Sequence, residues 1–159
     1  MIEWYNDDEL SIFFSDVPKV RPRIPLPSSS EEEIESMNKY PFINKRTIDV
    51  EILDHINEKV YKFTIPKGYL YDGATIPKFF WRIIGANTDN RFIVPAMIHD
   101  QLCEHHDYVD NDRKLSTKVF DALLKVSKVH PFKRFWMKHP MNIFQMCMGW
   151  NKKKKKVEE

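Results

Sequence analysis

Three ionisable side chains in this chain could carry out acid–base chemistry: Asp72, His99 and Asp100. Histidine titrates near neutral pH and can take a proton from water. Adjacent residues on an α-helix point about 100° apart, because the helix has 3.6 residues per turn. Asp100 is therefore better placed to bind a metal ion or a backbone amide than to orient the ring of His99. We predict that a remote acid, with Asp72 the leading candidate, orients the imidazole.

The loop that carries Asp72 reads Tyr71-Asp72-Gly73-Ala74-Thr75-Ile76-Pro77. Thr75 is typical of a helix N-cap, and proline is tolerated in the first turn that follows. We predict a short helix from there to Gly85. A purely structural interpretation stays open, in which Asp72 satisfies the free amides at the start of that helix and the residues at 99 and 100 bond to a loop.

Two alternatives for the segment around residue 99 involve its cysteine. His99, Cys103 and His106 are spaced to share one helical face, and zinc accepts these ligand types. A structural zinc site needs a fourth ligand, and no Cys-x-x-Cys or His-Glu-x-x-His motif occurs. The favoured interpretation is a core thiol with two exposed histidines at a helix end. Cys103 as a nucleophile beside His99 is a further alternative, but the helix around it is apolar and offers no activating N-terminus.

Strand patterns precede this region. Ile48, Val50 and Ile52 alternate with polar residues, and a second apolar alternation follows a short polar link at 55–58. Alternation on both sides of a short link is typical of a β-hairpin. We therefore predict two strands, at 46–54 and 59–65.

Helical patterns follow residue 90. We predict one helix from 91 or 95 to 106, with the proline at 95 as its first residue or a kink. The clearest amphipathic helix is predicted over 113–129. Its apolar positions recur at spacings of four, four and three: Leu115, Val119, Leu123 and Val126. One or two more helices are predicted after Pro131, broken at Pro140.

The first part of the chain has a different composition. Prolines at 18, 22, 25 and 27 favour extended backbone. Ser30 followed by Glu31-Glu32-Glu33 is typical of a helix start, and that helix should end near Pro41. We predict three parts: an N-terminal arm with a short helix (1–44), the main domain (45–150) and a basic tail (151–159). The predicted fold class is α+β, a small antiparallel β-hairpin or sheet followed by a helical bundle, with an extended N-terminal arm.

Composition limits the function classes. The chain has 159 residues, of which 42% are hydrophobic, enough for one ordinary domain. Two cysteines argue against a disulfide framework and indicate a reducing cytoplasm. The sequence predicts no signal peptide and no membrane span. The net charge of +2 does not argue for or against nucleic acid. The run Lys152–Lys156 could contact phosphate backbones, but the favoured interpretation is a solvated tail.

A set of residues between 71 and 102 carries a family resemblance: Tyr71 to Pro77, Trp81, Gly85, Ala96, His99, Asp100 and Leu102. The set resembles a bacteriophage and prophage family of unknown function, whose pattern is D-G-A-S/T-I-P, a tryptophan, a glycine and then A-x-x-H-D-x-L. The resemblance covers roughly residues 45–150. That family often has an Ala-Asp pair entering its next helix, where this chain has Ser116-Thr117, and the nearest acids are Asp112 and Asp121.

The resemblance implies a phage protein, and two functions are compatible with it. The first, slightly favoured because the expected acid is missing, is a virion or assembly component of the head or tail. The second is a small hydrolase with His99 as general base and Asp100 binding a divalent cation or the substrate. The predicted substrate-binding residues are Tyr71, Gly73, Thr75 and Trp81. A looser likeness to the His-Asp helix of secreted phospholipases A2 points to the same roles, without that family's disulfides.

Partners and location follow from these functions. We expect other phage proteins as partners, with the lysine run as a possible contact to nucleic acid. The expected location is the host cytoplasm or the virion.

Overall fold

The computed structural model describes residues 1–71 and 90–144, with backbone alone for 139–144. The predicted loop and short helix at 72–85 and the basic tail lie outside the described residues. The elements, in chain order, are β1 (Ile2–Asn6), β2 (Leu10–Phe14), β3 (Val20–Pro22), α1 (Glu31–Lys39), β4 (Phe42–Asn44), β5 (Ile48–Asp54), β6 (Lys59–Ile65), β7 (Leu70–Tyr71), α3 (Asn90–Glu104), the 3-10 helix η2 (His106–Val109), α4 (Arg113–Val126) and α5 (Pro131–Phe144). This is an α+β fold, as the sequence predicted.

The larger sheet has the antiparallel order β1-β2-β5-β6. The β5–β6 hairpin confirms the predicted pair of strands: successive residues alternate between the two faces of the sheet, and apolar positions such as Val50, Ile52 and Phe63 face the core. Asp54 closes the turn, since its carboxylate accepts hydrogen bonds from the amides of Ile56 and Asn57. The hairpin is therefore fixed by a local side-chain contact as well as by the ladder.

The first strands of the chain belong to this sheet. β2 pairs along β5, with Leu10 opposite Asp54 and Phe14 opposite Val50, and β1 forms the edge. Residues 2–14 therefore help to build the body of the molecule. A second, smaller sheet has the order β3-β4-β7.

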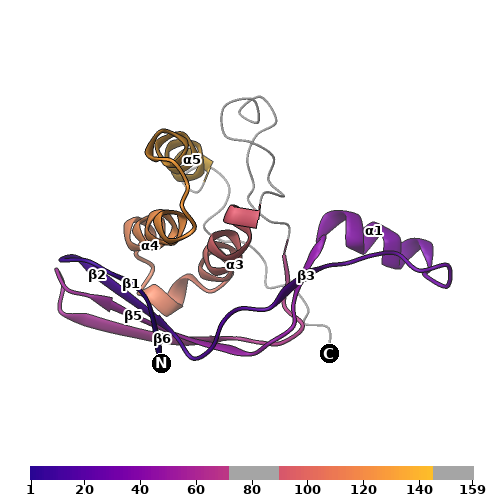
Figure 1. Cartoon of the computed structure of the whole chain (residues 1–159), viewed down its shortest axis with the longest axis horizontal. Helices are drawn as coiled ribbons and strands as arrows, with labels where there is room; N and C mark the ends of the chain where they lie inside the picture. Colours follow the sequence, from indigo (N-terminus) through magenta and orange to yellow (C-terminus); the bar gives the residue numbers. More distant parts are fainter. Residues whose placement is uncertain (72–89, 145–159) are drawn as a thin grey trace.

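The helices α3 and α4 cover one face of the larger sheet, and α5 packs beside α4 (Figure 1). α4 buries the stripe that the sequence predicted, including Leu115, Val119 and Leu123. These side chains join strand residues such as Ile12 and Ile52 in one hydrophobic core. The core therefore lies between the larger sheet and the pair α3 and α4.

Two prolines lie inside helices. α3 begins at Asn90, so Pro95 lies inside the helix and is not its first residue. The prediction that Pro140 breaks the last helix was wrong, because α5 runs continuously from Pro131 to Phe144. A proline removes one backbone donor and crowds the preceding turn, which disfavours a helix without making it impossible.

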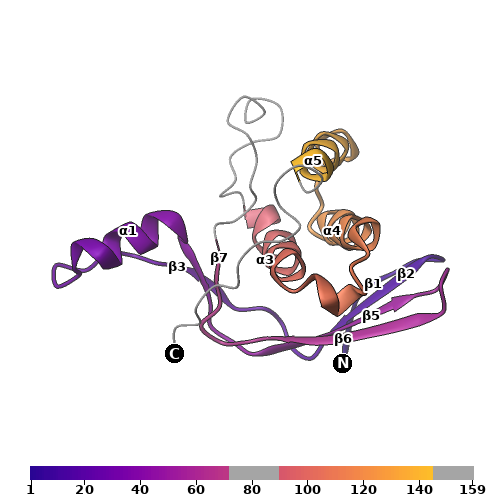
Figure 2. The same ribbon diagram turned by 180° about the vertical axis from the view of Figure 1, so that it is seen from behind.

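β3 and α1 extend away from the body, at the opposite end from α4 and α5 (Figures 1 and 2). We call residues 20–39 the projecting segment. As predicted, Ser30 caps α1: its side chain accepts from the amide of Glu33, and the Glu33 side chain accepts from the amide of Ser30. This reciprocal capping satisfies two amides at the helix start without any tertiary contact.

Across the described ranges, 1–71 and 90–144, every helix is too short or too polar to traverse a lipid bilayer.

Candidate functional site

The second half of α3 carries an unusual set of buried polar residues. His99, Asp100 and Glu104 are only 7%, 3% and 4% exposed. Ionisable side chains are rarely this buried unless they are paired. We therefore take the second half of α3, together with Tyr69 and the strand β7 that follows it, as the candidate site.

Asp100 and Glu104 converge on a single tyrosine. The hydroxyl of Tyr69 lies 3.0 Å from Oε1 of Glu104 and 3.2 Å from Oδ2 of Asp100. Burial, then the negative charges of Asp100 and Glu104, raises the pKa of Tyr69 well above its ordinary range. The hydroxyl therefore stays protonated at any physiological pH, and it donates its single proton to this carboxylate pair.

His99 faces a different neighbour. Its ring lies 5.0 Å from the ring of Phe120 on α4, and its Nδ1 and Nε2 lie 3.7 and 3.8 Å from Sγ of Cys103. Asp100, one residue on, bonds to Tyr69. The two neighbouring side chains thus point apart, as the 3.6-residue turn requires. In the described structure His99 is packed in the interface of α3 and α4, where little of its ring is accessible to a substrate.

The zinc alternative is not supported by the described residues. α3 ends at Glu104, so His106 does not continue the face shared by His99 and Cys103. Within residues 1–71 and 90–144, no three His, Cys, Asp or Glu side chains are grouped to hold a metal ion. Asp100 shares the hydroxyl of Tyr69 with Glu104, and a divalent ion at Asp100 would need further oxygen ligands.

The other predicted site residues fall in two groups. Tyr71 is fully buried, and its hydroxyl donates to the backbone oxygen of Ile93 at 3.1 Å, which ties β7 to α3. Its ring stacks near that of Tyr69, with 6.1 Å between centroids. The remaining predicted residues lie outside the described ranges: Asp72, Gly73, Thr75 and Trp81.

Sequence reasoning missed two members of this cluster, Tyr69 and Glu104. Glu104 lies four residues after Asp100, and this spacing puts both carboxylates on one face of a helix. That signal was available in the sequence. Tyr69 carried no comparable signal, because its role depends on how β7 docks against α3.

The chain belongs to a family described as "Protein of unknown function (DUF1353)", whose model matches residues 49–139. A relative, "Uncharacterized protein y4jT" from Sinorhizobium fredii (strain NBRC 101917 / NGR234), is 42% identical over 43 residues. These are 27% of this chain and 13% of the relative, so the match spans only a small part of the relative's length. No solved structure matches the chain. The family match includes all of α3 and α4, and hence the buried cluster.

Proposed function

We propose that this chain is a bacteriophage protein that serves as a head or tail component, or as an assembly factor, and docks onto other phage proteins through its projecting segment. The observation that supports docking is the exposure of this segment. No residue of α1 is buried. Ile24, Leu26 and Ile34 are 69%, 63% and 38% exposed. Apolar side chains gathered on one exposed feature are typical of surfaces that bind a partner.

The segment is ordered before any partner binds. The guanidinium of Arg23 donates to Oγ of Ser36 at 3.1 Å and to the backbone oxygen of Tyr40 at 3.0 Å. The amide of Arg23 also donates to the backbone oxygen of Pro41. A segment that is already folded loses less conformational entropy when it binds, which favours affinity.

The proposal also assigns a location and a second contact. The protein would act in the host cytoplasm or in the virion. The lysine run 152–156, outside the described residues, would contact the phosphate backbone of packaged nucleic acid.

Mass spectrometry of purified phage particles tests the proposal. The double variant Ile24→Ser/Leu26→Ser is compared with Ile56→Ser, a control in the β5–β6 turn whose isoleucine is 57% exposed. We expect the parent and the control in the particles, and the double variant depleted by about tenfold. Absence of the parent from particles and from assembly intermediates would remove the proposal. Equal incorporation of the double variant would remove the projecting segment as the docking surface.

A second candidate function is a small hydrolase. It is favoured by the buried cluster of Tyr69, Asp100 and Glu104, because the pKa of Tyr69 is raised and perturbed ionisable groups concentrate at functional sites. His99 would act as general base, Asp100 would bind a divalent cation or the substrate, and Asp72 would orient His99. The substrate would be an ester, an amide or a phosphodiester. Its contacts would be Tyr71, Gly73, Thr75 and Trp81.

A substrate screen tests this candidate. Generic ester, amide and phosphodiester substrates are offered with and without calcium or zinc, to the parent, to His99→Gln and to the control His55→Gln on the hairpin turn. Loss of a general base lowers the rate by about 10²–10⁴-fold. We expect that loss in His99→Gln only. No activity in the parent, or equal activity in all three proteins, would remove the candidate.

A further inference from the structure

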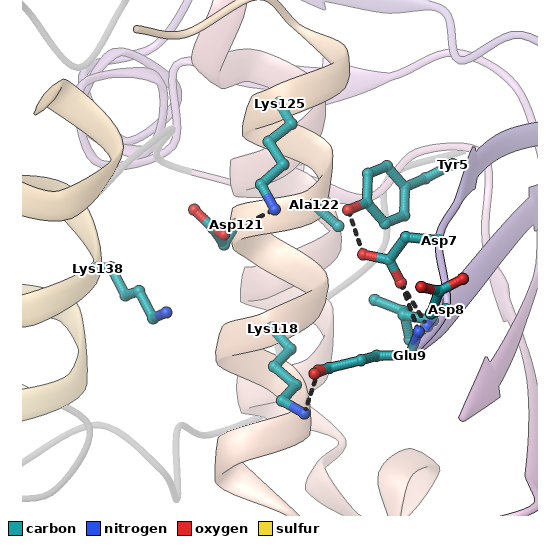
Figure 3. Close-up of a pocket in the computed structure, with 10 residues that line it drawn as sticks. Tyr5, Asp7, Asp8, Glu9, Lys118, Asp121, Ala122, Lys125 and Lys138 are labelled. Atoms are coloured by element: carbon teal, nitrogen blue, oxygen red, sulfur yellow. Dashed lines mark hydrogen bonds and ion pairs between the residues drawn. The ribbon is translucent and has the colours of Figure 1, made fainter. Parts of the chain in front are cut away.

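The helix α5 packs on the side of α4 that is turned away from the larger sheet (Figures 1 and 2). One of its faces points inward. On this inner face Met137 is 2% exposed, and Arg134 pairs with Asp121 of α4 at 3.3 Å. Figure 3 shows that Lys138 also extends from α5 toward α4. The contacts of α5 with the rest of the molecule therefore come from this inner face.

The opposite face of α5 exposes two phenylalanines. Phe132 and Phe135 are 56% and 54% exposed, and both lie about 150° around the helix from Met137. Every other phenylalanine whose side chain the structure describes is buried or half-buried. We call Phe132 and Phe135, with Trp136 beside them, the outer face of α5. Large apolar side chains gathered on an exposed face indicate a binding surface.

The rings of this outer face are packed edge to face. The ring planes of Phe135 and Trp136 are 89° apart, and those of Phe132 and Trp136 are 68° apart. Successive bases of a nucleic acid stack on rings that lie parallel to them, and this arrangement offers no continuous platform of that kind. A lipid bilayer accepts apolar rings in any orientation, because the burial of apolar area is not directional. The ring geometry therefore favours a bilayer over nucleic acid.

The charge around the outer face is positive. The sequence of α5, from Pro131 to Phe144, contains no Asp or Glu. Lys133 on α5 and Lys128 before it form no ion pair with any residue in the described ranges. Residues 127–156 contain nine Lys and Arg and no acid, whereas residues 1–126 contain 16 basic and 21 acidic residues. An anionic surface therefore complements this end of the chain.

We propose that the outer face of α5 binds the surface of a lipid bilayer that contains anionic headgroups. Phe132 and Phe135 enter the boundary between headgroups and acyl chains, and Lys128 and Lys133 contact the headgroup phosphates. The helix lies on the bilayer and does not cross it, since it has 14 residues and a span needs about 20.

This contact goes beyond the docking proposed for the projecting segment. α1 lies at the opposite end of the molecule from α5, and its first turn carries three glutamates, which an anionic surface would repel (Figure 1). The two surfaces therefore suit partners of different chemistry.

Co-sedimentation of the full chain with lipid vesicles tests the bilayer contact. The probes are vesicles of phosphatidylcholine alone and vesicles in which about 30% of the lipid is phosphatidylglycerol. We expect the parent to partition onto the anionic vesicles about tenfold more strongly than onto the neutral ones. Binding to neither kind of vesicle, or equal binding to both, would overturn the proposal.

Matched variants separate the outer face from other exposed apolar residues. Phe132→Ser/Phe135→Ser should weaken partitioning onto the anionic vesicles by about tenfold, because two apolar rings no longer enter the bilayer. The control Ile56→Ser/Val60→Ser removes two side chains of the β5–β6 hairpin that are each 57% exposed, and it should leave partitioning unchanged. Phe132→Leu/Phe135→Leu keeps apolar side chains there and should retain binding. No loss in the first variant, or equal loss in both serine variants, contradicts the proposal.

A second pair of variants tests the basic flank. Lys133→Gln should weaken partitioning onto the anionic vesicles by about fivefold. Lys67→Gln, at an exposed position between β6 and β7, is the control and should leave partitioning unchanged. The lysine run 152–156 stays in every protein, so its attraction to the vesicles is common to all comparisons. Equal losses in the two variants would assign the binding to net charge and not to this face.

Two other occupants of the outer face are tested with the same proteins. Fluorescence anisotropy measures binding to an oligothymidylate of about 20 nucleotides, and size-exclusion chromatography measures self-association. We expect Phe132→Ser/Phe135→Ser to match the parent in both. If that variant loses either property while its vesicle binding is unchanged, the face belongs to nucleic acid or to a second copy of the chain. Incorporation into phage particles is a separate readout, so this proposal and the docking proposal can fail independently.

Discussion

The helices α3 and α1 contrast in how they use their residues. In α3, eleven of 15 residues are buried, and these include His99, Asp100 and Glu104. In α1 none of nine residues is buried, although Ile34 is apolar. Both segments form helices, so local propensity does not explain the difference. Burial is decided by the neighbouring elements: α3 packs against α4 over one face of the larger sheet, whereas α1 stands away from both (Figure 2).

The contrast coincides with the family boundary. The family match covers residues 49–139 and therefore contains α3, while α1 precedes it. The buried acids thus belong to the part that this chain shares with its family. The exposed helix belongs to the part outside the match. The buried cluster of the candidate site therefore lies in the shared part, and the projecting segment of the docking proposal lies before it.

The largest effect should come from the core beneath His99. Phe120→Ala should lower the free energy of unfolding by about 3–5 kcal/mol, because it leaves a cavity against α3. Ile34→Ala on α1 should change it by less than about 0.5 kcal/mol. Urea denaturation measures both. Similar losses of free energy of unfolding in the two variants would show that α1 is packed in solution, and would contradict the difference between α1 and α3.

The next effect concerns the buried acids. Tyr69→Phe removes the donor shared by Asp100 and Glu104 and should cost about 1.5–3 kcal/mol, since the bond serves charged groups. Tyr71→Phe removes one bond to a neutral backbone oxygen and should cost about 1 kcal/mol. The free energy of unfolding of the two variants gives the comparison. If Tyr69→Phe costs no more than Tyr71→Phe, the carboxylates depend on other partners.

A pH-dependent effect is expected at the hairpin turn. Burial acts to raise the pKa of Asp54, but hydrogen bonds from Asn57 and Ile56 outweigh it, and the pKa lies below its ordinary value of 3.8. The folded state therefore favours the ionised form. The contribution of the Asp54 carboxylate to the free energy of unfolding is complete above the pKa that this group has in the unfolded chain. It is lost as the pH falls through the lower pKa of the group in the folded state.

The variant Asp54→Asn tests that shift. It should be about 1 kcal/mol less stable than the parent at pH 6. The difference in free energy of unfolding between the parent and the variant should decrease as the pH falls from 5 to 2. Urea denaturation at each pH measures this difference. A gap that stays constant over this range would assign the loss to packing and not to the ionised carboxylate.

The smallest effect should be confined to α1. Ser30→Ala removes the helix cap and should weaken α1 by about 1 kcal/mol, or roughly fivefold in amide protection by hydrogen exchange. Because α1 buries none of its residues, global unfolding should not change. Ser28→Ala, at an exposed serine before the cap, is the control. A fall in global stability would contradict the independence of α1.

Local signals in the sequence were sufficient for several elements. The β5–β6 hairpin, the Ser30 cap and the apolar stripe of α4 each depend on residues close in the chain, and all three were predicted. The pairing of β2 with β5 was not predicted, because it joins Leu10 to Asp54 across the intervening β3, α1 and β4. Neither β2 nor β5 has a sequence pattern that identifies the other as its partner strand.

The candidate site was predictable in part. The different directions of the His99 and Asp100 side chains follow from helix geometry alone. Glu104 could have been found from its spacing to Asp100, whereas Tyr69 depends on tertiary docking. The continuity of α5 through Pro140 could not be predicted either, because proline disfavours a helix interior only as a tendency.

The place of β2 between β1 and β5 has a consequence for synthesis on the ribosome. The N-terminal strands emerge first, yet the partner of β2 ends only at residue 54, so for some seconds of translation β1 and β2 have no completed sheet to join. We expect the β5–β6 hairpin, closed by a short turn, to form first. β1 and β2 would then pair with the free edge of β5. The start of the chain would then be the last part of the sheet to fold.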